Sequence, residues 1–252
     1  MAVTKDKVIF TIADEANMKY EKMMEKSLRK FHSADDLPLV VIGPEELKQR
    51  TVDPLFFYRA TPIIASELIN QGYKTVIKID ADSIVCDDLS ESWSNRAVDA
   101  SVVLNSNPRE WKSYPYTIWD ILPFQYLNCG YVVMRSKRFV ENWKALCLGQ
   151  HFPVYQMREQ DMLNIISQYG DYLVDLMDAH GSLWGLSSKG YWQDMVLKKN
   201  ELWLDPQPDG YPRASCKVKI IHWGGGNTDP QKMNYRTKFR EDVVKWLDKL
   251  TK

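Results

Sequence analysis

Two carboxylates, Asp80 and Asp82, stand one residue apart directly after the apolar run of residues 75–79. That run predicts a buried strand, since β-branched apolar residues fit a sheet that is covered on both faces. The acids would then lie at the carboxyl end of the strand, where open α/β sheets bind their ligands. Residues two apart on an extended chain point to the same side, so we expect both carboxylates to converge on one small volume.

Two unpaired carboxylates at such a place repel each other, and one of them tends to stay protonated. A bound divalent cation removes this conflict, and hard oxygen ligands suit Mg²⁺ or Mn²⁺. The oxygens of a diphosphate would complete the coordination shell. The alternative is that the pair only caps the next segment or lies in a solvated turn, because the pattern is short. The strand before it and the apolar pair Ile84-Val85 after it favour the metal site.

A second signal ends another apolar run, within residues 217–226, where His222 is followed by Trp223 and three glycines. Imidazole is a good ligand for ions such as Mn²⁺, and glycines let backbone amides approach phosphate oxygens closely. On its own, His222 could equally be a core histidine beside a flexible turn. Two strand ends with complementary ligand types support the metal site more strongly than either does alone.

The pattern of the surrounding chain predicts an α/β fold. Strands are expected at residues 8–13, 37–42 and 75–79, with helices at 18–31 and 62–72 between them. Because parallel strands need helical crossovers, this alternation indicates a doubly wound sheet.

The rest of the chain continues the alternation without a linker or an internal repeat, so we expect one domain over residues 1–252. Further strands are expected at residues 98–104, 126–134 (interrupted at 128–130), 172–176 and 218–221, and further helices at 138–148, 159–169 and 235–250. A long loop at 105–124 is rich in Pro, Trp and Tyr. Loops of this length in a compact domain are usually functional or disordered, and its aromatic residues argue against disorder.

Composition excludes several classes of protein. The 252 residues include 33 basic and 33 acidic side chains, so a strongly basic face for nucleic acid is not indicated. The four cysteines show no C-x-x-C spacing, which is typical of free thiols in a reducing compartment. No signal peptide and no run of about eighteen apolar residues is evident, so we expect a cytoplasmic protein without a membrane span.

Five segments, in this order, resemble the GT-A glycosyltransferases, and more narrowly family 8, the glycogenin and bacterial galactosyltransferase type. They are residues 10–14, residues 80–82 preceded by Tyr58-Arg59 and Pro62, residues 127–131, residues 159–164 and residues 222–225. The resemblance extends from residue 7 to about residue 230. It implies a Rossmann-like nucleotide-binding fold with a mixed, mainly parallel sheet flanked by helices. The nucleotide-sugar half would span about 1–104, the acceptor half about 105–234, and a C-terminal helix 235–250.

The resemblance also implies roles for individual residues. Asp80, Asp82 and His222 would bind Mn²⁺ or Mg²⁺, and Gln160, Asp161 and Glu159 would be the catalytic group facing the transferred sugar. The residues expected to bind the nucleotide-sugar are Thr11, Ala13, Asp14, Arg59, Asp80, Ala81, Asp82, Asn128, Gly130, Gly224, Gly225 and Lys232. For Arg59 the alternative is a surface ion pair, and for Gln160 and Asp161 it is the first turn of an amphipathic helix.

One segment departs from the family pattern. The family usually follows the histidine and glycines with Lys-Pro, whose lysine holds the leaving diphosphate, whereas this chain has Asn-Thr-Asp-Pro at residues 227–230. Either Lys232 takes that role, or the metal and the glycines stabilise the leaving group without it.

The implied activity is metal-dependent transfer of a sugar from a UDP-sugar donor to a hydroxyl of a glycan or other acceptor. An inverting enzyme needs a carboxylate base, for which the candidates are Asp161, Glu159, Asp178 and Asp120. A retaining enzyme, as family 8 members are, needs no such base, and Gln160 would then mainly position the sugar. The resemblance favours retention.

Aromatic side chains suggest where an acceptor would bind, because tyrosine and tryptophan rings can stack on sugars. The residues expected to bind the acceptor are Trp111, Tyr114, Trp119, Asp178 and Trp184. Ordinary core packing is the alternative for Trp119 and Trp184.

Two other classes of function stay open. A sugar nucleotidyltransferase usually carries a glycine-rich basic signature after its first strand, which residues 13–16 lack. A non-catalytic nucleotide-sugar or glycan binder would bind UDP without turnover.

Overall fold

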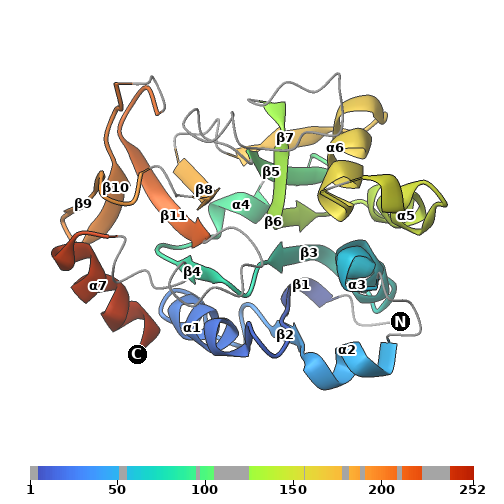
Figure 1. The fold of residues 1–252 in the computed structure, drawn as a ribbon, viewed down its shortest axis with the longest axis horizontal. Coiled ribbons are helices and arrows are strands. Elements are labelled where there is room, and N and C mark those ends of the chain that lie inside the picture. Colours follow the sequence, from blue (N-terminus) through green and yellow to red (C-terminus); the bar gives the residue numbers. More distant parts are fainter. Residues whose placement is uncertain are drawn as a thin grey trace.

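The structure is a computed structural model that describes residues 5–50, 56–94, 97–104, 125–155, 157–177, 182–187, 191–208, 212–222 and 239–252. Strands and helices alternate through the first half of the described chain (Figure 1). The elements are β1 (Lys5–Ile12), α1 (Met18–Arg29), β2 (Leu39–Ile42), α2 (Pro44–Arg50), η1 (Phe56–Arg59), α3 (Ala60–Asn70), β3 (Tyr73–Ile79), β4 (Ser83–Val85), α4 (Glu91–Ser94), β5 (Ala100–Leu104), β6 (Leu127–Met134), α5 (Lys137–Leu148), η4 (Phe152–Val154), α6 (Glu159–Tyr169), β7 (Val174–Leu176), β8 (Ser182–Ser187), β9 (Met195–Lys198), β10 (Glu201–Leu204), β11 (Cys216–His222) and α7 (Glu241–Thr251).

A six-stranded mixed sheet in the order β2-β1-β3-β6-β5-β7 forms the centre. The pairs β1–β2, β1–β3 and β5–β7 are parallel, and β6 is antiparallel to both β3 and β5. The predicted α/β class with a mainly parallel sheet is therefore confirmed. The expected strand–helix alternation over the first three sheet strands is confirmed as well, because α1 leads from β1 to β2 and α3 precedes β3, and both β2 and β3 pair in parallel with β1.

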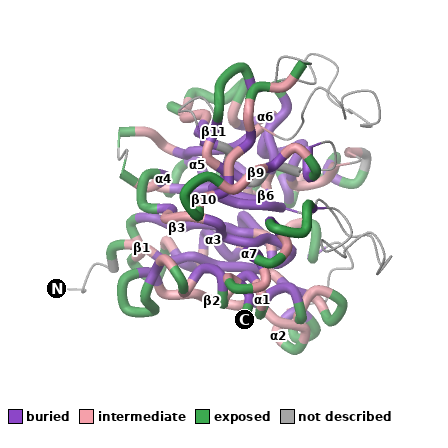
Figure 2. Tube along the Cα trace, turned by 90° about the vertical axis from the view of Figure 1, so that its left-hand side faces the viewer, coloured by how far each residue is buried: buried purple, intermediate pink, exposed green. Residues whose placement is uncertain are grey.

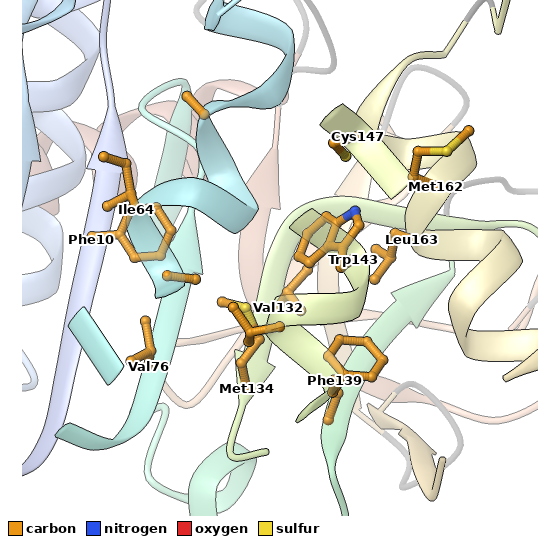
Figure 3. Close-up of a cluster of buried hydrophobic side chains, with 14 of the residues drawn as sticks. Phe10, Ile64, Val76, Val132, Met134, Phe139, Trp143, Cys147, Met162 and Leu163 are labelled. Carbon is orange, nitrogen blue, oxygen red and sulfur yellow. The ribbon is translucent and has the colours of Figure 1, made fainter. Parts of the chain in front are cut away.

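Alternating apolar residues along the strands bury both faces of this sheet. On one face, α3, α5 and α6 pack against residues such as Phe10, Val76 and Val132 (Figure 3). Trp143 of α5 is fully buried there, beside Leu163 of α6. Burial of the apolar sides of these helices stabilises this layer by about 25 cal/mol per Å². Helix α6 begins at Glu159, and Glu159 and Gln160 belong to the site described below.

The other face of the six-stranded sheet packs against α1 and a second sheet. Its core includes Ile9, Ile77 and Val133 from the first sheet, Leu28 from α1 and Ile220 from β11. Beyond the second sheet, α7 packs its apolar side on β9, β10 and β11 and also contacts α1 (Figure 1). Figure 2 shows the buried strands in the middle of these layers and exposed residues along their outer sides.

The second sheet was not predicted from the sequence. It runs in the order β4-β11-β10-β9, with β8 paired in parallel to β11. Its members other than β11 span three to six residues, too short for a clear alternating pattern. The β9–β10 hairpin turns at Lys199 and Asn200, whose φ angles are 51° and 67°, which matches the left-handed backbone of tight hairpin turns.

The structure differs from the prediction at three elements. Strand β6 is continuous from Leu127 to Met134, so residues 128–130 do not interrupt it. Residues 44–50 form helix α2, where no helix was expected. The C-terminal helix begins at Glu241 rather than near residue 235, and residues 235–238 lie outside the described part. The long loop 105–124 also lies outside the described residues. Within the described ranges, no helix is long and apolar enough to cross a bilayer.

Candidate active site

Asp80, Asp82 and His222 meet where the two sheets come together. Asp80 directly follows β3, Asp82 directly precedes β4, and His222 ends β11. Because β4 and β11 are antiparallel neighbours, His222 lies opposite Ser83. The His222 Nε2 atom is 2.9 Å from Asp80 Oδ2 and 3.2 Å from Asp82 Oδ1. The three candidate ligand atoms all lie within 4.8 Å of one another.

The charges of this cluster depend on one another. Burial lowers the pKa of His222, but the carboxylates of Asp82 and Asp80 outweigh that effect and raise it to about 10. The imidazole is therefore protonated at neutral pH and holds the two acids together without an ion. Burial favours the neutral form of Asp80, yet the cations Lys78 and His222 keep its pKa well below the usual range.

Lys78 is a site residue that the sequence analysis missed. Its side chain is 3% exposed, and its ammonium donates to Asp80 Oδ1 and, over 2.7 Å, to the carbonyl oxygen of Cys129. Burial opposes its charge, but Asp80 reverses the balance and raises the pKa of Lys78. The available signal was a lysine inside an apolar strand, two residues before Asp80 and so on the same side of the chain.

Gly130 leaves room for the imidazole ring. A Cβ atom at this position would lie 2.7 Å from His222 Cε1 and 2.5 Å from Asn128 Oδ1. The backbone N–H of Asp80 donates to the Gly130 carbonyl over 2.8 Å, which fixes the end of β3 against β6. Only glycine allows this close approach, so the Asn128–Gly130 segment forms the floor beneath the three candidate ligands.

The first turn of α6 contributes Glu159 and Gln160 to the same region. Thr61 donates to Glu159 Oε1 over 2.8 Å, and Gln160 Oε1 accepts the backbone N–H of Cys129 at 3.2 Å. Burial raises the pKa of Glu159 to about 7, although the Lys78 charge and the Thr61 hydrogen bond act in the opposite direction. This carboxyl therefore exchanges its proton near neutral pH.

Asp161 has a different environment. Its side chain is 0% exposed, the Tyr126 hydroxyl donates to Oδ1, and the Met157 backbone N–H donates to Oδ2 over 2.9 Å. These hydrogen bonds hold Asp161 in the core at the start of α6, directly behind Met157, which lines the cleft. Asp161 itself is not part of the described lining, and its contact with the sugar stays a prediction.

A cleft of about 360 Å³ opens over the cluster. Its described lining is Ile12, Asp14, Asn17, Phe57, Tyr58, Lys78, Asp80, Ala81, Asp82, Asn128, Cys129, Met157, Arg158, Glu159, Gln160 and His222. Asp14 is held by Asn17, whose backbone and side-chain nitrogens donate to Oδ1 over 3.0 and 2.8 Å. Arg158, with a φ of 52°, and the exposed Phe57 were not predicted, because no motif marks them. Tyr58, also exposed, belongs to the segment that resembles the family but had no predicted role.

Some predicted nucleotide-sugar residues do not line the described cleft. Thr11 and Ala13 are fully buried, so their side chains belong to the core, while their neighbours Ile12 and Asp14 line the cleft. The Arg59 guanidinium lies 4.9 Å from the centre of the Phe152 ring, and Arg59 is not among the described residues that line the cleft. A second groove of about 520 Å³ adjoins the cleft and shares Asp14 and Phe57 with it.

Most residues of the predicted acceptor site lie outside the described part of the chain. Trp184 is the exception: it is 2% exposed and stacks on Tyr131 with ring centres 5.8 Å apart. This burial agrees with the alternative of core packing, and a contact of Trp184 with an acceptor stays a prediction. The following candidates lie outside the described residues: Trp111, Tyr114, Trp119, Asp120, Asp178, Gly224, Gly225 and Lys232.

The residues present fit a divalent cation. Two carboxylate oxygens and one imidazole nitrogen are a donor set that suits Mn²⁺-like ions, and all three point at one another. His222 Nδ1 is buried without a hydrogen-bond partner among the described residues. The contact of Nε2 with the two acids therefore sets the orientation of the ring.

Comparison with known proteins agrees with this geometry at the level of fold. No protein-family model matches the sequence, and no curated protein matches it. The galactosyltransferase LgtC, solved in complex with donor and acceptor sugar analogues, aligns at 15% identity over 97% of this chain and 96% of its own, with a TM-score of 0.56. A glycosyltransferase involved in glycosylation of the major capsid of PBCV-1 aligns at 11% identity over 92% of this chain and 99% of its own, with a TM-score of 0.55.

The chain has a GT-A glycosyltransferase fold. A third similar structure, the glycosyltransferase GlyE of Streptococcus pneumoniae, aligns at 15% identity with a TM-score of 0.54, over 98% of this chain but 63% of GlyE. At these identities the likeness concerns the fold, so the chemistry of this chain has to be argued from its own cleft.

Proposed function

We propose that this protein is a metal-dependent glycosyltransferase that moves a sugar from a UDP-sugar to a hydroxyl of a glycan or other acceptor. The observation that carries the proposal is the convergence of Asp80, Asp82 and His222 at the floor of a cleft in a GT-A fold. Their three ligand atoms suit Mn²⁺ or Mg²⁺.

The metal would be held by Asp80 Oδ2, Asp82 Oδ1 and His222 Nε2, the atoms that already face one another. When bound, the cation would stabilise the negative charge that develops on the leaving diphosphate. Asn128 and Gln160 line the same cleft, and their amides would hydrogen-bond the hydroxyls of the transferred sugar.

Glu159 is the better candidate for a proton acceptor among the two acids of α6. It lines the cleft and its pKa is about 7, whereas the Asp161 carboxylate is already engaged by Tyr126 and Met157 in the core. A general base is most effective when its pKa lies near the working pH. If the enzyme retains configuration, as the resemblance to family 8 favours, Glu159 would instead position the sugar.

Release of UDP from a panel of UDP-sugars, with and without Mn²⁺, tests the proposal. We expect Mn²⁺-dependent release from one sugar, and a loss of about 100-fold or more in Asp82→Ala, because a metal ligand is removed. The matched control is Asp205→Ala, an exposed acid that pairs with Lys198 away from the cleft, and it should keep full activity.

Three other outcomes would contradict the proposal. UDP binding without release from any sugar, even with glycan acceptors added, would identify a non-catalytic binder. Formation of a UDP-sugar and pyrophosphate from UTP and a sugar phosphate would identify a nucleotidyltransferase. Equal activity in Asp82→Ala and wild type would show that the cluster is not the metal site.

A further inference from the structure

A buried lysine lies on the strand that delivers the first candidate metal ligand. Lys78 is 3% exposed and sits between Phe10 of β1 and Val132 of β6 in the sheet register. It belongs to the side of β3 that also carries Val76 and Asp80, since alternate residues of a strand share a face. A charge at such a central position is costly unless it is paired.

The two oxygens of Asp80 have different partners. Oδ1 accepts the Lys78 ammonium, while Oδ2 faces His222 Nε2 at 2.9 Å. A second hydrogen bond of 2.7 Å to the Cys129 carbonyl holds the ammonium in place. Oδ2 is therefore the oxygen that faces the candidate metal ligands, while Oδ1 is bound to a cation of the protein itself.

The formal charges of the site follow from this arrangement. In the metal-bound form His222 must be neutral to act as a ligand, so the carboxylates of Asp80 and Asp82 and the ammonium of Lys78 together contribute one negative charge. A divalent cation reverses that sign and leaves one positive charge, which attracts a diphosphate. The ammonium repels the cation at the same time, and such repulsion is strong at the short distances and low dielectric of a buried site.

We propose that Lys78 is a positioning residue that weakens binding of the free metal ion and strengthens its dependence on the diphosphate. The inference rests on the proposed function, since it takes Asp80, Asp82 and His222 as the metal site. It implies that the ion binds weakly to the empty cleft and tightly together with a nucleoside diphosphate. The ion and the diphosphate therefore stabilise each other's binding by the same factor.

Mn²⁺ titration of the full chain, monitored by the electron paramagnetic resonance signal of the free ion and repeated with saturating UDP, tests this role. The variants are Lys78→Met, which removes the charge, and Lys78→Gln, which is neutral but keeps a donor for the Cys129 carbonyl. The control is Lys245→Met, which removes an exposed cation of α7 that pairs with Glu241. Thermal unfolding of each variant establishes that it is folded, and Lys78→Gln serves if Lys78→Met is not.

We expect both neutral variants to bind Mn²⁺ at least about tenfold more tightly than wild type in the absence of UDP. The factor by which UDP tightens Mn²⁺ binding should be smaller in these variants, and Lys245→Met should behave as wild type. A merely structural lysine predicts the opposite sign, because its loss would disorder Asp80 and weaken the site.

Two results distinguish a wrong role for Lys78 from a wrong metal site. If wild type binds Mn²⁺ and the neutral variants bind it equally or less tightly, the role of Lys78 is wrong and the metal site stands. If neither wild type nor the variants bind Mn²⁺, with or without UDP, the metal site of the proposed function is wrong and this inference is overturned with it.

Discussion

Two short acidic segments, residues 80–82 and 159–161, have similar sequences, but their side chains lie in different environments. At the strand end, Asp80 and Asp82 both face the cleft and share the imidazole of His222. At the helix start, Glu159 lines the cleft while Asp161 is fully buried and bonded to Tyr126.

Backbone geometry explains this difference. Residues 80–82 form the turn between β3 and β4, and this turn brings both carboxylates to the cleft. On an α-helix of 3.6 residues per turn, side chains two residues apart are rotated by about 200° and so point to different surroundings. The neighbouring charges then set the pKa values. Cations keep Asp80 ionised despite its burial, whereas burial dominates for Glu159 and raises its pKa to about 7. An acidic motif therefore predicts a site only together with the element that carries it.

Replacing each acid by its isosteric amide would break this comparison, and Asp80→Asn should have the largest effect. The substitution leaves Lys78 buried without its carboxylate, which costs about 3 kcal/mol or more of folding stability. It should also weaken Mn²⁺ binding by about 100-fold or more. Urea denaturation and Mn²⁺ titration measure the two effects, and unchanged Mn²⁺ binding would remove Asp80 from the metal site.

Glu159→Gln should change how stability depends on pH. The unfolded chain releases this proton near the ordinary value of 4.5, but the folded protein keeps it up to about pH 7. The native state therefore binds more protons between these values, and wild-type stability falls as pH rises through that window, by up to about 3 kcal/mol. In Glu159→Gln, whose amide does not titrate, folding stability should not fall over this pH range.

Urea denaturation at pH 5 and pH 8 provides the measurement for Glu159→Gln. The control is Glu241→Gln on the exposed side of α7, which should leave the difference between the two pH values nearly unchanged. A wild-type protein that is equally stable at both values, and a variant that matches it, would contradict the raised pKa.

Asp161→Asn should have the smallest effect of the three substitutions. It should lower folding stability without changing Mn²⁺ affinity. The new amide nitrogen would face either the Tyr126 hydroxyl or the Met157 N–H, both of which donate to the native carboxylate. One unsatisfied buried donor costs about 1–3 kcal/mol. Urea denaturation should show this loss of stability, and Mn²⁺ affinity should stay at the wild-type value. If sugar transfer is lost while stability is kept, Asp161 belongs to the catalytic group.

The sequence predicted the parts of the fold that long, regular patterns determine. Strand β3, helix α1 and helix α6 were found because an apolar run or helical spacing persists over seven or more residues. Strands β4, β8, β9 and β10 were missed, although β2 and β7 are as short and were found. Strands β4 and β8 pair with β11, which lies far from them in the sequence, and local patterns do not contain such contacts.

The candidate site was predictable to the extent that it lies at strand ends. Asp80, Asp82 and His222 were expected together, and the structure brings them together. The burial of Asp161 and Trp184 could not be predicted, because it depends on tertiary packing. Lys78 was overlooked since a lysine within a strand usually faces solvent, and only the structure shows that it is buried beside Asp80.

The pairing of β4 with β11 also bears on the order of folding. It joins Ser83, from the first half of the chain, to His222, from near its end, and contacts so distant in sequence close large loops and form slowly. During folding, Asp80 and Asp82 can take up their positions early, but His222 joins them only when β11 pairs with β4. A cation that needs all three would bind the finished fold alone, and would therefore slow its unfolding without hastening its formation.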